Sequence, residues 1–321
     1  MISILVTYYN QEKYVSRSLE SILAQKLTED FEILVGDDGS QDNTCKIVQE
    51  YSEKYPGKIR LFIQPRDLNV KYSAVVRASY NRLNLLKNAK GDYVCFLDGD
   101  DEYCDYTWLQ ESVDILNSNK KLVGVAHNYK ETYEDGSEII PKGLEGQQYI
   151  TAKLYCRDLY TPAGAVLFRR VFTERDYKKL IQLKAFDDHD ITFYFLNYGD
   201  LLTVNKIVYN YYQNSNSIWN SANELEKSLL VGIDFEVISR IIKKHHKFLL
   251  IKYFPHLYFC YRNKQRLSNK IYEKYKVQCL KNRIMDIIMN WDSASYLNKI
   301  KIHIIVFYYR VIFKCLRLVY K

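Results

Sequence analysis

The stretch Gly91-Asp92-Tyr93-Val94-Cys95-Phe96-Leu97-Asp98-Gly99-Asp100-Asp101 decides the fold of this chain. Its apolar residues, 94–97, form a short uninterrupted run, which is the pattern of a strand buried on both faces in a parallel sheet. Three carboxylates follow that run. In open sheets of this kind, ligands bind in the crevice beyond the carboxyl ends of the strands. The stretch therefore predicts an α/β fold with a ligand site at the end of this strand.

The three acids, Asp98, Asp100 and Asp101, would repel one another unless a positive group lay between them. Mg²⁺ or Mn²⁺ suits that position, because hard divalent cations prefer oxygen ligands and often bridge carboxylates and substrate phosphates. The spacing after Asp100 departs from a calcium-binding EF-hand loop. The alternative is a solvated Asp-Gly turn that holds no ligand.

Outward from this stretch, the first 130 residues alternate between apolar runs and amphipathic segments. The runs predict strands at residues 2–6, 31–35, 59–63, 93–97 and 122–126. The segments between them predict helices, with Asn10 and Asp42 as caps. This order implies a mostly parallel sheet with helices on both faces.

The pattern of residues 129–224 is mixed. Residues 130–140 predict a hairpin around Asp135-Gly136, and residues 165–168 predict a strand. Asp187-Asp188-His189-Asp190 opens an apolar helix. From residue 224 onward the signal is helical and basic.

Three polar segments follow strands of this predicted sheet: residues 7–10, 37–40 and 98–101. An aromatic ring beside a carboxylate suits a nucleobase, because Tyr9 can stack and Asp38 can accept a hydrogen bond from a pyrimidine N–H. Taken singly, these segments could be a cap, a packing ring and a turn. The chain contains neither G-x-x-x-x-G-K-[ST] nor G-x-G-x-x-G, which argues against a P-loop or a dinucleotide site.

Three motifs carry a family resemblance: Val6-Thr7-Tyr8-Tyr9-Asn10, Asp37-Asp38-Gly39-Ser40-x-Asp42, and Ala89-Lys90-Gly91-Asp92-Tyr93 leading to Asp98-Gly99-Asp100-Asp101. In this order and spacing, over roughly residues 1–220, the chain resembles the inverting family-2 glycosyltransferases of the GT-A fold. The resemblance implies a nucleotide-sugar donor, with Thr7, Tyr9 and Asp38 at the base. It places Asp98 and the adjoining Gly99 near the ribose, and Asp100 on a Mn²⁺ or Mg²⁺ ion at the diphosphate.

The family's catalytic base lies in an acidic pair at the head of a helix, which Asp187-Asp188 matches. The resemblance therefore implies Asp188 as the base, and a single displacement needs one such carboxylate to take the acceptor's proton. The alternative for this pair is a helix N-cap. Secondary candidates for the acceptor side are Asp187, His189, Asp101 and Trp219, the last as a lid. The family's Tyr-Arg-x-His is replaced by Tyr212-Gln213-Asn214-Ser215, so its phosphate-side cation is missing there.

The expected function is inverting transfer of a sugar, from a UDP-type donor to a glycan or lipid-linked glycan of a bacterial surface polysaccharide. Two alternatives remain open, a nucleotidyltransferase that forms sugar nucleotides and an inactive nucleotide-binding module. A nucleotidyltransferase would need a Gly-rich basic loop after the first strand, where residues 7–11 read Thr-Tyr-Tyr-Asn-Gln. No recognition motif for nucleic acid accompanies the basic charge.

Charge divides the chain into a catalytic domain, 1–222, and a basic helical region, 223–321. Within the first, we expect a nucleotide-sugar half at about 1–105 and an acceptor half at about 106–222. Residues 1–224 carry 26 Lys and Arg against 32 Asp and Glu, whereas residues 225–321 carry 20 against 6. The apolar run at 2–6 has no charged leader before it, and the seven cysteines show no C-x-x-C pair. We therefore expect a cytoplasmic protein with reduced cysteines.

Residues 293–321 contain no acid and predict a basic amphipathic helix. Its cationic stripe comprises Arg310, Lys314, Arg317 and Lys321, joined by His303. Its predicted apolar side comprises Ile304, Ile305, Tyr308, Ile312, Cys315, Leu316 and Val319. Such a helix suits the anionic inner leaflet of a membrane, where the protein would be peripheral. The alternative is a terminal helix packed on the protein's own core.

Overall fold

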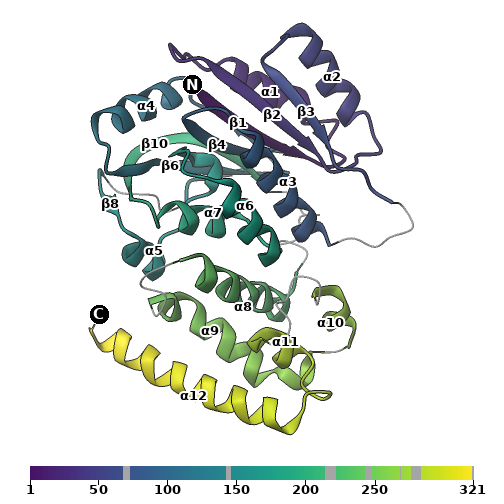
Figure 1. Ribbon diagram of the computed structural model, residues 1–321, viewed down its shortest axis with the longest axis vertical. Helices are drawn as coiled ribbons and strands as arrows, with labels where there is room; N and C mark the ends of the chain where they lie inside the picture. Colours follow the sequence, from purple (N-terminus) through teal and green to yellow (C-terminus); the bar gives the residue numbers. More distant parts are fainter. Residues whose placement is uncertain are drawn as a thin grey trace.

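The computed structural model describes residues 1–67, 73–141, 146–213, 222–242, 248–267, 269–275 and 283–319. Figure 1 shows a broad twisted sheet at one end of the molecule and a stack of helices from the carboxyl-terminal third at the other. Helices α6 (Glu174–Leu180) and α7 (Asp188–Phe195) lie between the sheet and this stack. The expected α/β class with a helical carboxyl-terminal extension is confirmed.

One sheet runs through the amino-terminal two thirds of the chain, in the order β3-β2-β1-β4-β9-β6-β10-β5, with β7 beside β6 and β8 beside β10. Its strands are β1 (Ile2–Tyr8), β2 (Phe31–Asp37), β3 (Ile59–Ile63), β4 (Tyr93–Asp98), β5 (Glu102–Tyr103), β6 (Leu122–Tyr133), β7 (Glu138–Ile139), β8 (Tyr149–Ile150), β9 (Val166–Arg169) and β10 (Asp200–Gln213). Strands β1 to β4 are parallel to their neighbours within this set, and β10 is parallel to β6. Strand β9 is antiparallel to both of its neighbours, so the second half of the sheet is mixed.

Helices cover both faces of the sheet, which explains why its central strands are apolar without interruption. The remaining helices of this part are α1 (Val15–Leu23), α2 (Thr44–Lys54), α3 (Ala74–Asn88), α4 (Trp108–Ser118) and α5 (Ala152–Asp158). Successive strand residues point to opposite faces. Ile4 and Val6 join one core with α1, α2 and α4, whereas Leu5 joins a second core with α3, α7 and the carboxyl-terminal helices.

Neither predicted cap is the N-cap of its helix: the N-cap of α2 is Asn43, one residue after Asp42, and the N-cap of α1 is Tyr14. Helix α1 begins at Val15, so Asn10 is not its cap. Asn10 instead adopts a left-handed φ of 52°, which asparagine tolerates, and its Oδ1 accepts a hydrogen bond from Gln41 N at 2.8 Å. Asp42 accepts from the backbone of Thr44, the first residue of α2, at 3.0 Å. The loops after β1 and β2 are thereby linked.

The mixed region contains one long strand that the sequence analysis did not predict. Strand β10 pairs with β6 along most of its length, but the register shifts around residue 207. The hairpin is confirmed by the pairing of Glu131 with Ile139, and the strand at 165–168 by β9. The acidic segment opens α7 as expected.

The last third of the described chain is helical: α8 (Glu224–Ile241), α9 (Leu249–Arg262), α10 (Asn269–Tyr275), α11 (Ile284–Met289) and α12 (Tyr296–Val319). Figure 1 shows α8, α9 and α12 stacked in that order away from α7. Buried side chains of α8 and α9 belong to the same core as α7, so this region packs continuously onto the sheet domain. No helix in the described part of the chain is long and apolar enough to cross a bilayer.

Helix α12 has two apolar sides. Ile302 and Val306 are buried against the helices beneath, and Ile305, Ile312 and Leu316 turn toward the same side or its edge. The opposite side leaves large apolar residues exposed: Leu297, Ile300, Ile304, Phe307, Tyr308, Val311 and Leu318, here called the exposed apolar stripe. The single apolar face that the sequence predicted is thus split between core and solvent. The cations Arg310, Lys314 and Arg317 are exposed, and Lys321 lies outside the described residues.

Candidate active site

The strand register brings the predicted site residues to one edge of the sheet. Thr7 of β1 lies opposite Asp98 of β4, and Tyr8 lies opposite Asp37 of β2. A cavity of about 270 Å³ opens at this edge. Six residues singled out from the sequence line it: Thr7, Tyr9, Asp38, Asp98, Gly99 and Asp100. The structure therefore gathers these residues around a single space.

The two adjacent acids after β2 have separate functions in the fold. Asp37 forms the turn, because its Oδ1 accepts from the backbone of Gly39 at 2.9 Å and of Ser40 at 2.8 Å. Gly39 has a φ of +75°, which glycine adopts without strain. With Asp37 fixed in this way, Asp38 is the carboxylate that lines the cavity.

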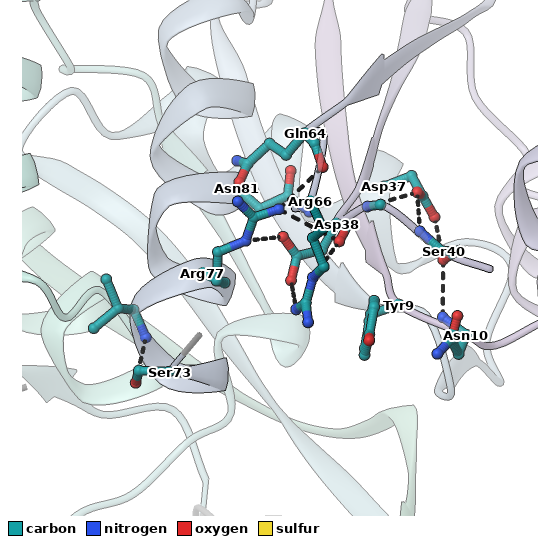
Figure 2. Close-up of polar contacts among 12 residues, drawn as sticks. Tyr9, Asn10, Asp37, Asp38, Ser40, Gln64, Arg66, Ser73, Arg77 and Asn81 are labelled. Carbon is teal, nitrogen blue, oxygen red and sulfur yellow. Dashed lines mark hydrogen bonds and ion pairs between the residues drawn. The ribbon is translucent and has the colours of Figure 1, made fainter. Parts of the chain in front are cut away.

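Figure 2 shows two arginines converging on Asp38. Arg77 of α3 donates from Nε to Asp38 Oδ1 at 2.6 Å, and Arg66 pairs with Oδ2 and donates from Nε to the backbone oxygen of Asp38 at 2.7 Å. The Arg66 guanidinium also lies over the ring of Tyr9, 3.8 Å from its centroid. The stacking face of Tyr9 and the carboxylate of Asp38 are therefore both covered by Arg66.

A second arginine of α3 holds the carboxylate at the end of β4. Arg82 Nη2 contacts Asp98 Oδ1 at 2.7 Å and Oδ2 at 2.9 Å, and Thr7 Oγ1 donates to Oδ1 at 3.2 Å. Burial alone would lower the pKa of Arg82, but the charges of Asp98 and Asp188 raise it above its usual range. Arg82 thus remains charged between these two carboxylates.

The other two acids of the cluster differ from each other. Asp101 is buried and ties down β10, because it accepts from Tyr212 N at 2.8 Å and from the hydroxyl of Tyr209. Burial, followed by the charge of Asp98, raises the pKa of Asp100 to about 6. Within the described residues, no group of three or more His, Cys, Asp or Glu is arranged to hold an ion. A cation at Asp100 would therefore need further oxygen ligands from substrate or water, as Mg²⁺ usually has.

Asp188 is the first residue of α7, and two donors orient it. Its Oδ1 accepts from Ala163 N at 3.1 Å, and its Oδ2 accepts from the hydroxyl of Tyr160 at 3.0 Å. Burial, followed by the charge of Asp98, raises the pKa of Asp188 to about 6. A carboxylate that is fixed in place and poised near neutrality can serve as a general base.

The described secondary candidates contact other parts of the fold in ways that stabilise it. Asp187 caps α7 in a reciprocal capping box with Asp190, and Asp101 anchors β10 as described. His189 packs against the rings of Tyr155 and Tyr160, and burial, followed by the charge of Lys252, holds its pKa well below the usual range. His189 is therefore neutral at physiological pH. Trp219 lies outside the described residues.

Several residues around the site were not predicted from the sequence: Arg66, Arg77, Arg82, Tyr160 and Tyr211. Arg82 lines the cavity together with Ala74, Ala78 and Asn81, which lie on one face of α3 at helical spacing. That face, small and polar within an otherwise amphipathic helix, is the signal that could have revealed Arg82. Tyr160 and Tyr211 come from segments whose patterns showed no site.

Comparison with known sequences identifies the family. The model of "Glycosyl transferase family 2" matches residues 3–175, more than half of the chain. An uncharacterized glycosyltransferase of Nostoc, alr2836, is 29% identical over 183 residues, which cover 54% of this chain and 52% of that protein. Chondroitin synthase of Escherichia coli is 25% identical over 252 residues, covering 77% of this chain and 34% of the synthase. The chain spans about half the length, or less, of these curated relatives.

Comparison with solved structures identifies the same architecture. The crystal structure of S. aureus TarS 1-349 in complex with UDP matches with a TM-score of 0.61 at 18% identity, over 100% of this chain and 93% of that one. A mannosyltransferase of Pyrobaculum calidifontis, PcManGT, in complex with GDP-Man and Mn²⁺, matches with a TM-score of 0.51 at 14% identity, over 99% and 86%. Together with the family match, this fold and its strand-end site lead to one conclusion: the chain is a glycosyltransferase of family 2 with the GT-A fold.

Proposed function

We propose that this glycosyltransferase uses a UDP-sugar donor and transfers the sugar with inversion to a hydroxyl of a glycan or lipid-linked glycan. The observation that carries the proposal is the cavity at the ends of β1, β2 and β4, because it joins an aromatic ring, a buried acceptor carboxylate and a strand-end acid. The UDP complex of the structural neighbour TarS supports uridine as the base.

In this proposal the base lies between Tyr9 and Asp38. Tyr9 stacks on the pyrimidine, and Asp38 accepts a hydrogen bond from its ring N–H. Because Arg66 covers the Tyr9 ring and pairs with Asp38, it must move aside when the base enters. Arg77 remains on the other oxygen and keeps Asp38 oriented. Thr7, with Asp98 and Gly99, lies where the ribose follows.

Asp100 is the residue we propose to hold Mn²⁺ or Mg²⁺. Its oxygen donors fit such an ion, and its position beside Asp98 gives a local excess of negative charge that a cation would offset. When bound, the ion would supply charge neutralisation to the departing diphosphate. Arg82 adds a permanent cation on the same side, and so provides the positive charge that the motif at residues 212–215 lacks.

Asp188 is the proposed base. As the bond between the anomeric carbon and the diphosphate oxygen breaks, the acceptor oxygen forms its bond to that carbon from the opposite face and gives its proton to Asp188. The hydrogen bonds from Ala163 and Tyr160 aim the carboxylate. Its position at the start of α7 favours the ionised form, because helix N-termini stabilise negative charge.

For the acceptor, the relatives favour a polymer. Two relatives are chondroitin synthase of Escherichia coli and teichoic acid poly(glycerol phosphate) polymerase of Staphylococcus epidermidis. We propose that this chain acts on a cell-envelope glycan at the cytoplasmic face of the membrane. The exposed apolar stripe and cations of α12 would attach it peripherally to that surface. We retain 1–222 as the catalytic domain and 223–321 as the attachment region.

A panel of donors tests this function. Melting temperatures are measured with UDP-glucose, UDP-GlcNAc and GDP-mannose, each with and without Mn²⁺, and transfer is followed to a soluble oligosaccharide. We expect a Mn²⁺-dependent upward shift with uridine donors alone, and a product of inverted anomeric configuration. A shift confined to GDP-mannose would contradict the assignment of the base, and retention of configuration would contradict the assignment of Asp188.

A further inference from the structure

A second cavity lies within the carboxyl-terminal helices, far along the chain from the donor site. It has a volume of about 140 Å³, opens to solvent and is bordered by α8, α11 and α12. Its polar lining comprises Glu236, Ser239, Arg240, Arg283, Lys301 and Tyr309. None of these residues was assigned a function above.

This cavity is lined by three cations and by one carboxylate, Glu236, which lies close enough to Arg283 to interact with its charge. Arg240, Arg283 and Lys301 are exposed, and no ion pair joins any of them to a carboxylate in the described part of the chain. Glu236 is only 6% exposed. Its Oε1 accepts from Met285 N at 2.9 Å, whereas its Oε2 is buried without any hydrogen bond. A buried, unsatisfied carboxylate oxygen costs free energy, so a ligand that donates to it would be favoured.

The cavity borders the exposed apolar stripe of α12. Lys301 lies three residues before Ile304 and seven before Tyr308, so all three occupy the same side of the helix. Ile304 and Tyr308 are 62% and 59% exposed. Cations beside exposed apolar side chains match the two parts of a phospholipid, its phosphate and its acyl chains.

We propose that this cavity binds the phosphodiester of a hydroxyl-bearing anionic lipid headgroup, such as phosphoglycerol, while the exposed apolar stripe enters the acyl layer. This inference rests on the membrane attachment proposed above and gives it a defined site. The two arginines suit phosphate oxygens through directed N–H donors, and Lys301 adds a point charge. A headgroup hydroxyl would donate to the free Oε2 of Glu236.

A second copy of the chain fits the surface less well than a lipid. Residues 293–321 contain no acidic residue, so pairing two α12 helices would set the cations of one copy against those of the other. An anionic bilayer instead provides the opposite charge at every position. Each lysine or arginine near such a surface adds to the attraction.

The experiment compares two triple variants with the same loss of charge. One removes the cavity cations (R240Q, R283Q and K301Q), and the other removes cations on the far flank of the stripe (R310Q, K314Q and R317Q). Sedimentation measures the binding of the full chain to phosphatidylcholine vesicles containing either phosphatidylglycerol or phosphatidylmethanol, which carry the same charge but differ in headgroup hydroxyls. We expect the wild type to prefer phosphatidylglycerol at least threefold. The cavity variant should lose this preference, and the flank variant should keep it while binding both lipids more weakly.

Glu236→Gln gives a finer test of the headgroup contact. The glutamine oxygen can still accept from Met285, which leaves an NH₂ donor in place of the free acceptor, so the preference for hydroxyls should vanish while charge attraction persists. The assays are run at pH 8, because burial raises the pKa of Glu236 to about 7, and protonation would turn one of its acceptor oxygens into a donor. The melting shift with UDP and Mn²⁺ serves as the control for folding and reports separately on the donor site.

Three outcomes would overturn the inference. If both triple variants kept the headgroup preference equally, vesicle binding would be due to unspecific electrostatic attraction and not to the cavity. If the intact protein failed to bind anionic vesicles but showed a normal melting shift with UDP, the proposed membrane attachment would be wrong. The proposed glycosyl transfer would not be affected. If soluble glycerol phosphate raised the melting temperature and the protein did not bind vesicles, the ligand of the cavity would be a free phosphate compound.

Discussion

At the scale of single residues, the site depends on carboxylates that share one region but have different partners. Asp98 is paired with Arg82, Asp101 is tied to β10, and Asp38 is held by two arginines. Asp100 and Asp188 are the two whose pKa values are raised to about 6. These two are therefore the acids from which we expect metal binding and proton transfer.

Replacement of the proposed base gives the sharpest test. Asp188→Asn keeps the size of the side chain but cannot accept a proton, so transfer should fall about 10²–10⁴-fold while the UDP melting shift survives. In the wild type, Asp188 is ionised above its pKa, so kcat should be maximal above pH 6 and fall about tenfold per unit below it. Near-normal turnover of the variant, or an acid limb that persists in it, would exclude Asp188.

The metal prediction concerns Asp100. Asp100→Ala should abolish the Mn²⁺-dependent part of the UDP melting shift. It should leave the melting temperature of the free protein within a few degrees of wild type, because burial, followed by the charge of Asp98, already disfavours the ionised side chain. Asp92→Ala, on the surface before β4, serves as the control. A normal Mn²⁺-dependent shift in Asp100→Ala would remove Asp100 from the metal site.

Arg66 should compete with the nucleobase. A cation over an aromatic ring at an accessible site contributes about 0.5–1 kcal/mol, so Arg66→Ala should tighten UDP binding by roughly two- to fivefold, since 1.4 kcal/mol equals a factor of ten. Titration calorimetry measures the change. Weaker binding by the variant would instead show that Arg66 itself contacts the nucleotide.

At the scale of elements, the contact between β2 and α3 positions Arg77 and Arg82 of the site. Gly36 lies against Asn81, and Asn81 Nδ2 donates to the backbone oxygen of Gly36 at 2.8 Å. A Cβ added to Gly36 would lie 2.0 Å from Asn81 Oδ1. Gly36→Ala should therefore push α3 outward and destabilise the fold by about 1–3 kcal/mol. Chemical denaturation measures this cost, and a double-mutant cycle with Asn81→Ala should show strong non-additivity. Additive effects would argue against the clash.

The same elements show what the sequence could and could not predict. The acids at 98–101 and the turn at 37–40 were predictable because the signal lies within a short stretch of sequence. Each follows directly after a strand whose apolar pattern is unambiguous. Strand β10 was missed because its register shifts near residue 207 break the alternation on which strand prediction relies. Arg82 and Tyr160 contact their carboxylates only through tertiary packing. Arg82 lies 16 positions from Asp98, and Tyr160 lies 28 positions from Asp188. Asn10 resembled a cap but links two loops, which no local pattern reveals.

At the scale of the whole molecule, α12 belongs to the core on one side and faces solvent on the other. Ile302→Ala should cost about 2–5 kcal/mol, because the side chain is fully buried, whereas Ile304→Ala, two residues away and 62% exposed, should stay within about 0.5 kcal/mol. Vesicle binding should respond in the reverse order. Truncation after Ser293 would strip this core face, so we expect it to destabilise the helical region as well as weaken vesicle binding. Equal costs for the two alanine variants would contradict the two-sided packing.

The stacking order α7, α8, α9 and α12 also sets the distance between α12 and the helix that carries Asp188. Adjacent helices pack with axes about 8–10 Å apart, so three such steps separate α12 from the helix that carries Asp188 by roughly 25–30 Å. With α12 lying on a bilayer, the reacting hydroxyl must stand well clear of the lipid headgroups. A first sugar joined directly to a lipid phosphate could not reach that level, whereas the growing end of an oligosaccharide could. If α12 attaches to a membrane and Asp188 is the base, as proposed, this stacking would favour an enzyme that elongates chains over one that begins them.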